Sequence, residues 1–385
     1  MIVAVVQEIF PGEKCVALTP QRTALLRKAG LDVHIQSGAG HMAGFMDSQY
    51  EQQGGVIVAD RTAVLASADI LVQLHVSGAS SATSATDLAA LKQGAVVIGF
   101  AEPYSNRNGI EALAGRGATL LAMELVPRIS RAQNMDALSS MASLAGYKAV
   151  LLAAGHLPKI FPMMVTAAGT LTGAKVLVIG AGVAGLQAIA TARRLGAQVS
   201  AYDVRPAVKE QIQSLGAKFV ELPLEKKDAQ TVGGYAAEQS AEEQTRQREL
   251  MAKVVAESDV VISTAAVPGK KAPVLVTQAM VRAMAPGSVI VDLAALRGGN
   301  CEMTKPDQSV DCQGVTILGP TNLPADVAFH ASQVYANNMG NVLNHLIKKG
   351  ELVWNLEDQI TREMLVLKAG EVVNPVVRKA WGLSG

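Results

Sequence analysis

Charge of either sign is scarce in this chain, and like charges never gather into a run of five or more. Of the 385 residues, 17% are charged and the formal net charge is +1, whereas ordinary soluble domains are about 25% charged. A surface that binds nucleic acid or anionic lipid needs clustered Lys and Arg side chains. The composition therefore excludes DNA and RNA as partners.

Cysteine is also rare, and no apolar run is both long and unbroken. Cys15, Cys301 and Cys312 have no spacing typical of a disulfide framework or a metal site. The uncharged stretch at residues 176–192 is interrupted by glycines, so no segment is expected to span a bilayer. The first residues show no secretory signal. We therefore expect a cytoplasmic chain without a bound metal.

Short apolar strands that alternate with helical segments are abundant. Hydrophobic residues make up 49% of the sequence, which excludes disorder, and the length predicts two domains with large cores. The alternation predicts parallel sheets covered on both faces, and so an α/β protein with two doubly wound, Rossmann-like domains. The expected strands are residues 2–6, 33–35, 56–58, 70–74, 95–99 and 118–122 in a first series, and 175–179, 198–202, 218–220, 260–264, 288–293 and 315–318 in a second.

Two long helical segments are expected to join these domains. Residues 134–156 are apolar and free of proline, and residues 329–349 have an equally helical pattern. The first leaves the N-terminal domain and the second returns to it. The expected N-terminal domain is 1–138 plus 328–385, the expected nucleotide-binding domain is 139–327, and a cleft separates them. Residues 221–248, charged and rich in glutamine, are expected to form a mobile surface excursion.

A glycine motif near the start of the second series carries the first functional signal. Gly180-Ala-Gly182-Val-Ala-Gly185 follows an apolar strand and opens a helix. In dinucleotide-binding motifs the first glycine forms the tight turn, the second lets the backbone approach a pyrophosphate, and the third allows close helix–strand packing. Free N–H groups at the helix N-terminus bind phosphate. The predicted dinucleotide site contains Gly180, Gly182, Val183, Gly185, Thr264 and Ala265.

An acidic residue follows this motif at the expected distance of about 20 residues. Asp203 ends the second strand of the unit, where a carboxylate binds the ribose 2′-hydroxyl of NAD and repels the 2′-phosphate of NADP. Arg205 has two interpretations: it accommodates a 2′-phosphate, or it is a solvated cation at a helix start. We favour the second, and therefore predict NAD(H) as the cofactor.

Several motifs together resemble one enzyme family. They are Pro127-Arg128-Ile-Ser-Arg131-Ala-Gln133-Asn-Met-Asp136-Ala-Leu-Ser139-Ser140, Ala145-Gly-Tyr147, the glycine motif and Val267-Pro268-Gly269-Lys270-Lys271-Ala-Pro273. Over nearly its whole length the chain resembles the alanine dehydrogenase and nicotinamide nucleotide transhydrogenase superfamily. The Arg-Ile-Ser-Arg-Ala-Gln run and a Gly-Gly-Tyr segment are similar to those of soluble NAD(H)-binding alpha subunits, domain I, of proton-translocating transhydrogenases.

The resemblance implies roles for individual residues. Arg128 and Asp136 would orient the carboxamide of the nicotinamide, and Ser139 would hold its ring. Gln133 would reach toward a second nucleotide, and Tyr235 would belong to a mobile loop that closes over bound nucleotide.

The residue types alone allow plainer interpretations of the same positions. Arg128 and Asp136 fit a solvated ion pair at a helix start. Ser139 fits a capping or small packing residue. Tyr235 fits an ordinary residue of a disordered loop.

The resemblance also shows what this chain lacks. Cys15, Phe100 and Leu296 stand where the alanine dehydrogenase branch has its substrate-binding Arg, catalytic His and catalytic Asp, and the catalytic Lys falls at Gln73 or His75. Oxidising an amino acid moves protons and needs a general acid or base. Hydride transfer between two nicotinamides needs only proximity, orientation and exclusion of water. His75 is expected to be an ordinary polar residue, because nothing in the sequence supplies an orienting partner.

The sequence thus predicts the NAD(H)-binding subunit of an NAD(P)⁺ transhydrogenase, which passes a hydride directly to NADP⁺ on a partner subunit. With one dinucleotide motif and no expected membrane span, the NADP(H) site and a membrane-embedded proton channel are assigned to partners. These partners would hold the chain at the inner face of the cytoplasmic membrane. The resemblance further implies coupled proton translocation and a homodimer. Two alternatives stay open: an alanine-type amino-acid dehydrogenase, and an NAD-binding module without catalysis.

Overall fold

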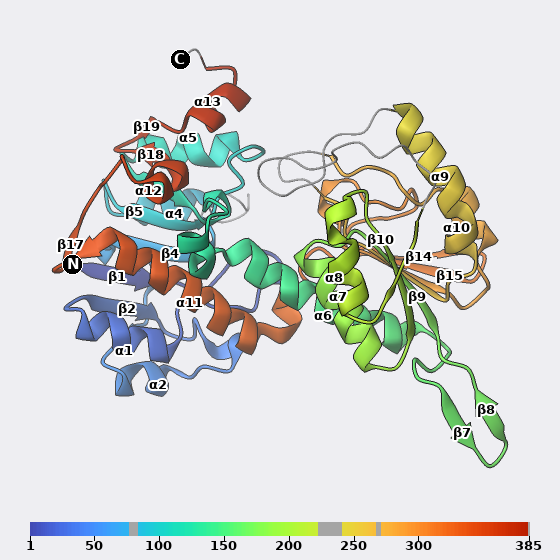
Figure 1. Cartoon of the computed structure of the whole chain (residues 1–385). Helices are drawn as coiled ribbons and strands as arrows, with labels where there is room; N and C mark the ends of the chain where they lie inside the picture. Colours follow the sequence, from blue (N-terminus) through green and yellow to red (C-terminus); the bar gives the residue numbers. More distant parts are fainter. Residues whose placement is uncertain (77–83, 222–240, 267–270, 384–385) are drawn as a thin grey trace. The chain divides into compact units, whose positions relative to one another are not determined.

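The computed structural model describes residues 1–76, 84–221, 241–266 and 271–383, and divides into two compact units (Figure 1). Unit 1 comprises Met1–Met141 and Pro324–Gly385, and unit 2 comprises Ala142–Leu323. Both are α/β units with largely parallel sheets, which confirms the predicted fold class. Tyr235 with its Gly-Gly neighbours, and residues 267–270, lie outside the described residues.

The sheet of unit 1 has eight strands in the order β19-β18-β6-β5-β4-β1-β2-β3. The six strands β1 to β6 are parallel, and the order reverses between β1 and β4. β18 and β19 add an antiparallel edge that the sequence did not predict. The strands are β1 (Ile2–Val5), β2 (Asp32–Gln36), β3 (Val56–Val58), β4 (Ile70–His75), β5 (Val96–Phe100), β6 (Thr119–Ala122), β18 (Leu365–Lys368) and β19 (Glu371–Val372).

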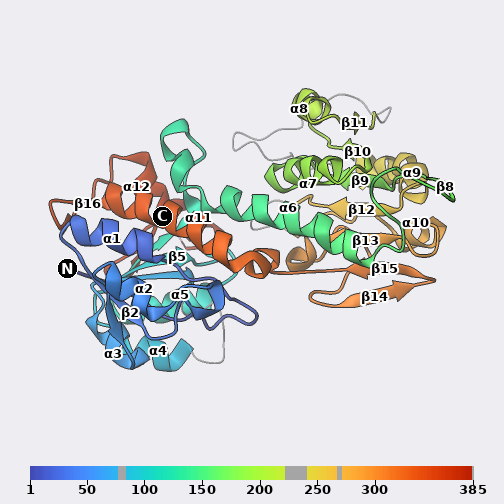
Figure 2. The ribbon, with the colours of Figure 1, turned by 90° about the horizontal axis from the view of Figure 1, so that it is seen from below.

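Helices cover both faces of this sheet. Apolar side chains of α3, α5 and α13 are buried in one core with alternate strand residues, while α1 and α11 lie together on the opposite side (Figure 2). The helices are α1 (Pro20–Lys28), α2 (Asp47–Gln52), α3 (Arg61–Ser67), α4 (Ser84–Ala90), α5 (Arg107–Gly115), α11 (Ala328–Leu346), α12 (Gln359–Met364) and α13 (Pro375–Ala380). A short hairpin, β16 (Ile347–Lys348) and β17 (Glu351–Leu352), follows α11.

Unit 2 contains a seven-stranded sheet in the order β11-β10-β9-β12-β13-β15-β14, which Figure 2 shows from top to bottom. Apart from the antiparallel edge strand β14, the strands are parallel and follow the order typical of dinucleotide-binding domains. The order reverses between β9 and β12, where ligands of such sheets bind. The strands are β9 (Lys175–Ile179), β10 (Gln198–Tyr202), β11 (Lys218–Phe219), β12 (Val260–Ser263), β13 (Val289–Asp292), β14 (Ser309–Cys312) and β15 (Val315–Leu318).

Successive residues of β9 enter two different cores. Val176 and Val178 pack with α6, α7 and α8, whereas Leu177 and Ile179 pack with α9 and α10 on the other face. Burial on both faces explains why this strand is apolar throughout rather than alternating. The helices are α6 (Ala137–His156), α7 (Val183–Arg194), α8 (Lys209–Ser214), α9 (Ala241–Ala256) and α10 (Gln278–Ala283).

Helix α6 is the one described helix that is long and apolar enough to cross a membrane, judged by its 20 residues and mean hydropathy of 1.3. The prediction from sequence concerned residues 176–192 instead. Ala149, Val150 and Ala153 of α6 are fully buried in the core of unit 2, although only 28% of the apolar window of this helix is buried. That no segment spans a bilayer therefore stays a prediction.

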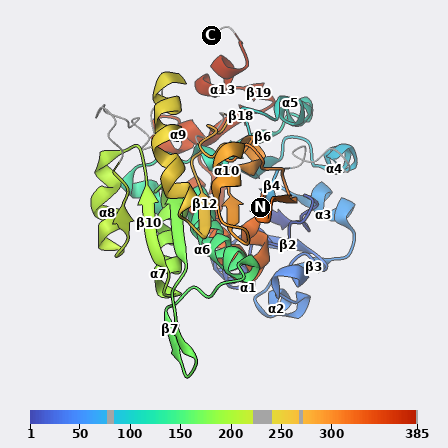
Figure 3. The same ribbon diagram turned by 90° about the vertical axis from the view of Figure 1, so that its right-hand side faces the viewer.

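Three sequence expectations need correction. The helix predicted from residue 134 begins at Ala137, after a 3₁₀ helix, η3 (Ser130–Met135). Of the surface excursion predicted over 221–248, residues 222–240 lie outside the described residues, and the prediction is wrong for residues 241–248, which begin α9 (Ala241–Ala256). A hairpin of β7 (Met164–Thr166) and β8 (Gly169–Leu171), absent from the predicted strands, extends away from the sheet of unit 2 (Figures 1 and 3).

Candidate functional site

The glycine turn joins β9 to α7 at the point where the strand order reverses. Gly180 has φ +94°, a conformation that only glycine adopts readily. A Cβ atom on Gly185 would lie 1.9 Å from the carbonyl oxygen of Gly180. The backbone of the unit itself therefore requires glycine at both positions.

Gly182 is different, because the described chain gives it no reason to be glycine. It is the N-cap of α7 with φ −74°, which any residue adopts. Among the described residues, a Cβ atom at position 182 would meet nothing within 4 Å. The first turn of α7 holds no acidic residue to compensate its positive end. The turn thus combines open space above its backbone with an uncompensated helix N-terminus, an arrangement that would suit a pyrophosphate.

Thr264 and Ala265, just past β12, are fixed beside this turn. The Thr264 hydroxyl donates to the Gly180 carbonyl at 3.0 Å. The side chain of Asn300 accepts from the Ala265 N–H at 3.0 Å and donates to the Ala265 carbonyl at 2.8 Å. Asn300 in turn donates its backbone N–H to the buried carboxylate of Asp292 at 2.7 Å. Sequence reasoning missed Asn300 and Asp292, which belong to no motif.

Asp203 and Arg205 form an ion pair rather than standing apart. The Arg205 guanidinium donates from Nε to Oδ1 of Asp203 at 2.9 Å and from Nη2 to Oδ2 at 2.8 Å. The Arg205 side chain is only 13% exposed, and its bonds to Asp203 raise its pKa above the usual value. The favoured interpretation of Arg205 as a solvated cation is therefore wrong, because the adjacent carboxylate draws the guanidinium inward.

The residues assigned to the nicotinamide lie in unit 1, around η3 and the first turn of α6. Arg128 and Gln133 are exposed. Asp136 precedes α6 and accepts from the backbone N–H of Ser139 at 2.9 Å and from its hydroxyl at 2.6 Å. Asp136 is therefore the capping residue of this helix start, and the capping role considered for Ser139 is wrong, because Ser139 supplies the capped N–H and a hydroxyl donor. The two hydrogen bonds from Ser139 leave further acceptor positions on the Asp136 carboxylate.

Three residues of the C-terminal segment hold η3 in place. Asn338 and Asn341 of α11 each donate a side-chain N–H to the Asn134 carbonyl at 2.9 Å. Arg131 makes a bidentate ion pair with Asp358, at 2.7 and 3.1 Å. Gln133 therefore stands between two anchored neighbours. These partners are more than 200 residues away along the chain, so no spacing could have revealed them.

His75, at the end of β4, has an orienting partner that the sequence does not reveal. Its Nε2 lies 3.2 Å from Oε2 of Glu13, and Phe10 stacks on its ring at 4.2 Å. Burial disfavours the charged imidazole, but the hydrogen bond with Glu13 and the charge of Glu8 outweigh it and raise the pKa of His75. The expectation of an unoriented His75 is wrong, since Glu13 reaches it from a loop 62 residues away.

The buried carboxyl group of Glu8 should make the stability of unit 1 depend on pH. Its carboxylate accepts the Leu74 N–H at 2.6 Å, but burial raises its pKa from 4.5 to about 7. Because the folded pKa is the higher one, the stability linked to Glu8 is complete below pH 4.5 and is lost as the pH rises through 7. Between pH 5 and pH 8 the free energy of unfolding of the unsubstituted chain should therefore fall by on the order of 2–3 kcal/mol because of Glu8, and Glu8→Gln should abolish this decrease. Chemical denaturation at both pH values measures it.

The exposed Glu51 provides the control for this measurement. Glu51→Gln removes a carboxylate without removing a buried charge, so its unfolding free energy should follow that of the unsubstituted chain with pH. Parallel curves for Glu8→Gln and the unsubstituted chain would contradict the assignment.

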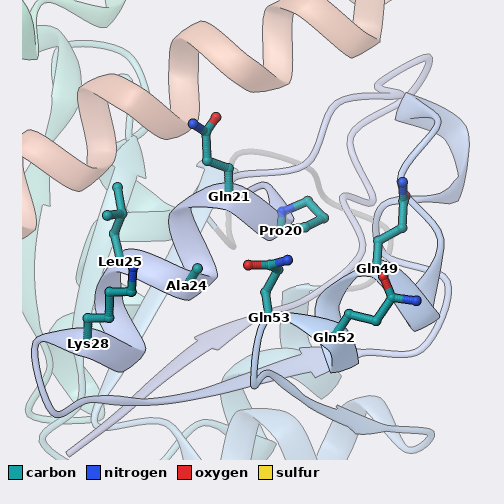
Figure 4. Close-up of a pocket in the computed structure, with 8 residues that line it drawn as sticks. All are labelled: Pro20, Gln21, Ala24, Leu25, Lys28, Gln49, Gln52 and Gln53. Atoms are coloured by element: carbon teal, nitrogen blue, oxygen red, sulfur yellow. The ribbon is translucent and has the colours of Figure 1, made fainter.

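A surface groove of about 470 Å³ lies between α1 and α2 (Figure 4). Its polar wall is formed by Gln49, Gln52 and Gln53, with Leu25 and Lys28 opposite. None of its eight lining residues is a predicted site residue. The groove supplies no carboxylate, imidazole or thiol for chemistry.

Comparisons with known proteins cover both units. The family described as "Alanine dehydrogenase/PNT, N-terminal domain" matches residues 4–145, and "Alanine dehydrogenase/PNT, C-terminal domain" matches residues 149–375. A protein of Rickettsia prowazekii, named as the first portion of an NAD(P) transhydrogenase subunit alpha, is 44% identical over 99% of this chain and 98% of its own length. A protein of the same name from Rhodospirillum rubrum is 45% identical over 98% and 99%.

A solved structure gives the same result. The transhydrogenase of Sinorhizobium meliloti has a TM-score of 0.86 and 43% identity, over 97% of this chain and 100% of that one. The sequence identity over whole chains, the fold and the motifs therefore all indicate the same family. The chain belongs to the alanine dehydrogenase/PNT family, among its NAD(P) transhydrogenase alpha subunits.

Proposed function

We propose that the chain binds NADH at the glycine turn of unit 2 and presents the nicotinamide for direct hydride transfer to NADP⁺ on a partner subunit. One observation carries the proposal: glycine at position 182 is demanded neither by its φ nor by any described neighbour. A closely approaching pyrophosphate is the reason for glycine at that position. The uncompensated N-terminus of α7 supports the same ligand.

The remaining residues divide the work of binding and orientation. Asp203 receives the adenosine ribose, while Thr264 and Ala265 form the backbone wall beside the turn. Arg128, Asp136 and Ser139 orient the carboxamide end, and Gln133 contacts the second nucleotide. NADH supplies the hydride when bound, so the chain has to provide position and a dry environment rather than a proton donor.

The partners follow from what this chain is proposed to lack. We assign the NADP(H) site and the proton channel to other subunits, which hold this chain at the inner face of the membrane and couple the transfer to proton movement. Mixing the chain with the NADP(H)-binding partner and following NADH oxidation by an NADP⁺ analogue tests the proposal. Exchange that needs both polypeptides supports it. No exchange in a mixture shown to form the complex refutes it.

We further propose that the chain is a homodimer, formed through the β7–β8 hairpin. Four large apolar side chains of the hairpin and its approach are exposed: Met163 by 69%, Met164 by 45%, Val165 by 75% and Leu171 by 47%. An isolated two-stranded hairpin is barely stable in water, and its outer edges offer unpaired N–H and C=O groups. A second copy of the chain would cover both the apolar residues and the edges.

Val165→Asp should therefore convert the dimer to a monomer at micromolar concentration, because it would bury a carboxylate in that interface. Light scattering after size-exclusion chromatography measures the mass. Leu25→Asp places the same charge on an apolar residue of α1 that is 46% exposed and should leave the dimer intact. A dimer that persists in Val165→Asp would place the interface elsewhere.

One observation favours an amino-acid dehydrogenase: His75 and Glu13 form an oriented pair at the carboxyl end of β4. Against it, Cys15 is buried and Leu296 is 66% exposed, and neither carries a charge for a carboxylate or ammonium group. The isolated chain should not reduce NAD⁺ with any L-amino acid. Turnover abolished by His75→Gln would establish the dehydrogenase instead.

A further inference from the structure

The carboxylate of Asp203 is already saturated with donors in the free chain. Asp203 follows β10 directly and is 8% exposed. Its Oδ2 accepts the Ala181 N–H at 2.7 Å and Nη2 of Arg205 at 2.8 Å. Its Oδ1 accepts the Arg205 backbone N–H at 2.8 Å and Nε of the same residue at 2.9 Å. A carboxylate offers about four acceptor positions, so a ribose hydroxyl finds none open.

The four donors are of two kinds. The Ala181 and Arg205 backbone N–H groups are parts of the glycine turn and of the turn after β10, so they fix one lone pair on each oxygen of Asp203. The two guanidinium donors occupy the other lone pair of each oxygen, and they can leave by side-chain rotation. When the guanidinium leaves, one acceptor position opens on each of two adjacent oxygens.

A ribose presents the matching pattern, since its 2′- and 3′-hydroxyls are two adjacent donors. We propose that Arg205 is a specificity-determining residue: it occupies the ribose positions of Asp203 in the free chain, and NADH binds by replacing its two N–H donors with the two hydroxyls. This inference rests on the proposed binding of NADH at the glycine turn. It extends that proposal by assigning Arg205 as an internal competitor of the ribose rather than as a solvated residue.

The exchange has a direct consequence for nucleotide choice. NADPH carries a phosphate in place of the 2′-hydroxyl, so it has only one of the two donors, and its negative charge meets that of Asp203. The one remaining hydroxyl of NADPH replaces only one of the two guanidinium donors that are lost with the bidentate ion pair. The displaced guanidinium stays tethered two residues from Asp203, where it offsets part of a 2′-phosphate charge. For NADPH, the attraction between the displaced guanidinium and the 2′-phosphate balances or exceeds the cost of breaking the ion pair. Arg205 therefore weakens NADH binding and narrows the preference for NADH over NADPH.

Arg205→Met tests the competition, because methionine keeps most of the apolar stem and removes every donor. Titration calorimetry of the whole chain should show NADH binding tightened by about three- to tenfold, the factor expected when a partly buried ion pair no longer has to break. NADPH binding should weaken or stay the same. Arg205→Lys, with a charge but no planar pair of donors, should fall between the two chains. NADH binding that weakens, or stays within twofold, in Arg205→Met would overturn the proposal.

Two further variants separate this inference from the site on which it rests. Asp203→Asn should weaken NADH binding and relax the preference against NADPH, and Gly182→Ala should weaken NADH binding alone. If neither variant changes NADH binding, the nucleotide does not bind at this turn, and both proposals fail. If both weaken binding but Arg205→Met does not tighten it, only the competition fails. The unfolding free energies of all four variants show whether each chain is folded. If Arg205→Met does not fold, Arg205→Lys still tests the competition.

Discussion

Alanine at position 182 should leave the chain folded and remove most of its NADH binding. The added methyl meets no described atom within 4 Å, and the N-cap φ of −74° suits alanine. In the complex that we propose, however, the methyl would lie where the pyrophosphate approaches the backbone. Losing two charge-assisted hydrogen bonds from the turn weakens binding by about 100-fold or more. Calorimetric titration with NADH, beside a denaturant melt, measures both effects.

Gly185→Ala is the matched control from the same motif. Its methyl would lie 1.9 Å from the Gly180 carbonyl oxygen, so it should cost on the order of 2–4 kcal/mol of unfolding free energy. Gly182→Ala should thus impair NADH binding in a folded chain, whereas Gly185→Ala should lower the stability of the fold. Gly182→Ala that binds NADH within twofold of the unsubstituted chain would show that no pyrophosphate contacts this backbone.

Gln133→Leu should slow hydride transfer far more than it weakens NADH binding. Gln133 is exposed within η3 (Ser130–Met135), where we propose that it contacts the nucleotide of the partner. Losing that orientation should lower the rate of transfer in the assembled complex by about 10- to 100-fold, with the NADH dissociation constant changed by less than about threefold. Stopped-flow absorbance gives the rate, and equilibrium titration gives the affinity.

Two other variants sharpen this test. Asp358→Asn weakens the ion pair that anchors Arg131 beside Gln133, so its transfer rate should fall less than that of Gln133→Leu, and Asp358→Glu should recover part of the loss. Gln53→Leu, in the groove of Figure 4, should change neither quantity. Equal losses of affinity and rate in Gln133→Leu would assign Gln133 to NADH itself.

The parallel strands were predictable because they are buried on both faces. Val176–Val178 and its neighbours face cores on both sides, so each strand reads as an unbroken apolar run between polar turns. β14, with the polar sequence Ser309–Cys312, and β19, two residues long, lie at sheet edges and carry no such run. Their position depends on contacts made after the sheet has formed, which a local pattern does not contain.

In the candidate site, too, features fixed by neighbouring residues could be predicted from the sequence, whereas features fixed by side-chain direction or by distant residues could not. Gly180, Gly182 and Gly185 were found because the motif spans only six residues: the backbone requires glycine at positions 180 and 185, and the proposed pyrophosphate accounts for glycine at position 182. The Arg205–Asp203 pair was misread although the two residues are close in sequence, since spacing gives no side-chain direction.

Distant partners were beyond any sequence signal. Glu13 reaches His75 across 62 residues, and Asn338 reaches Asn134 across 204. Such pairs exist only once the sheet and α11 have brought separate segments together.

Direct hydride transfer is the central claim, and NADH with deuterium at both hydrogen positions of C4 tests it most directly. The chain, mixed with its NADP(H)-binding partner, should move the label to C4 of the reduced NADP⁺ analogue without exchange with water, because no proton donor takes part at either carbon. Mass spectrometry of the product measures its retention. Full retention is the predicted result, while label lost to solvent, or a product formed without the label, would contradict direct transfer.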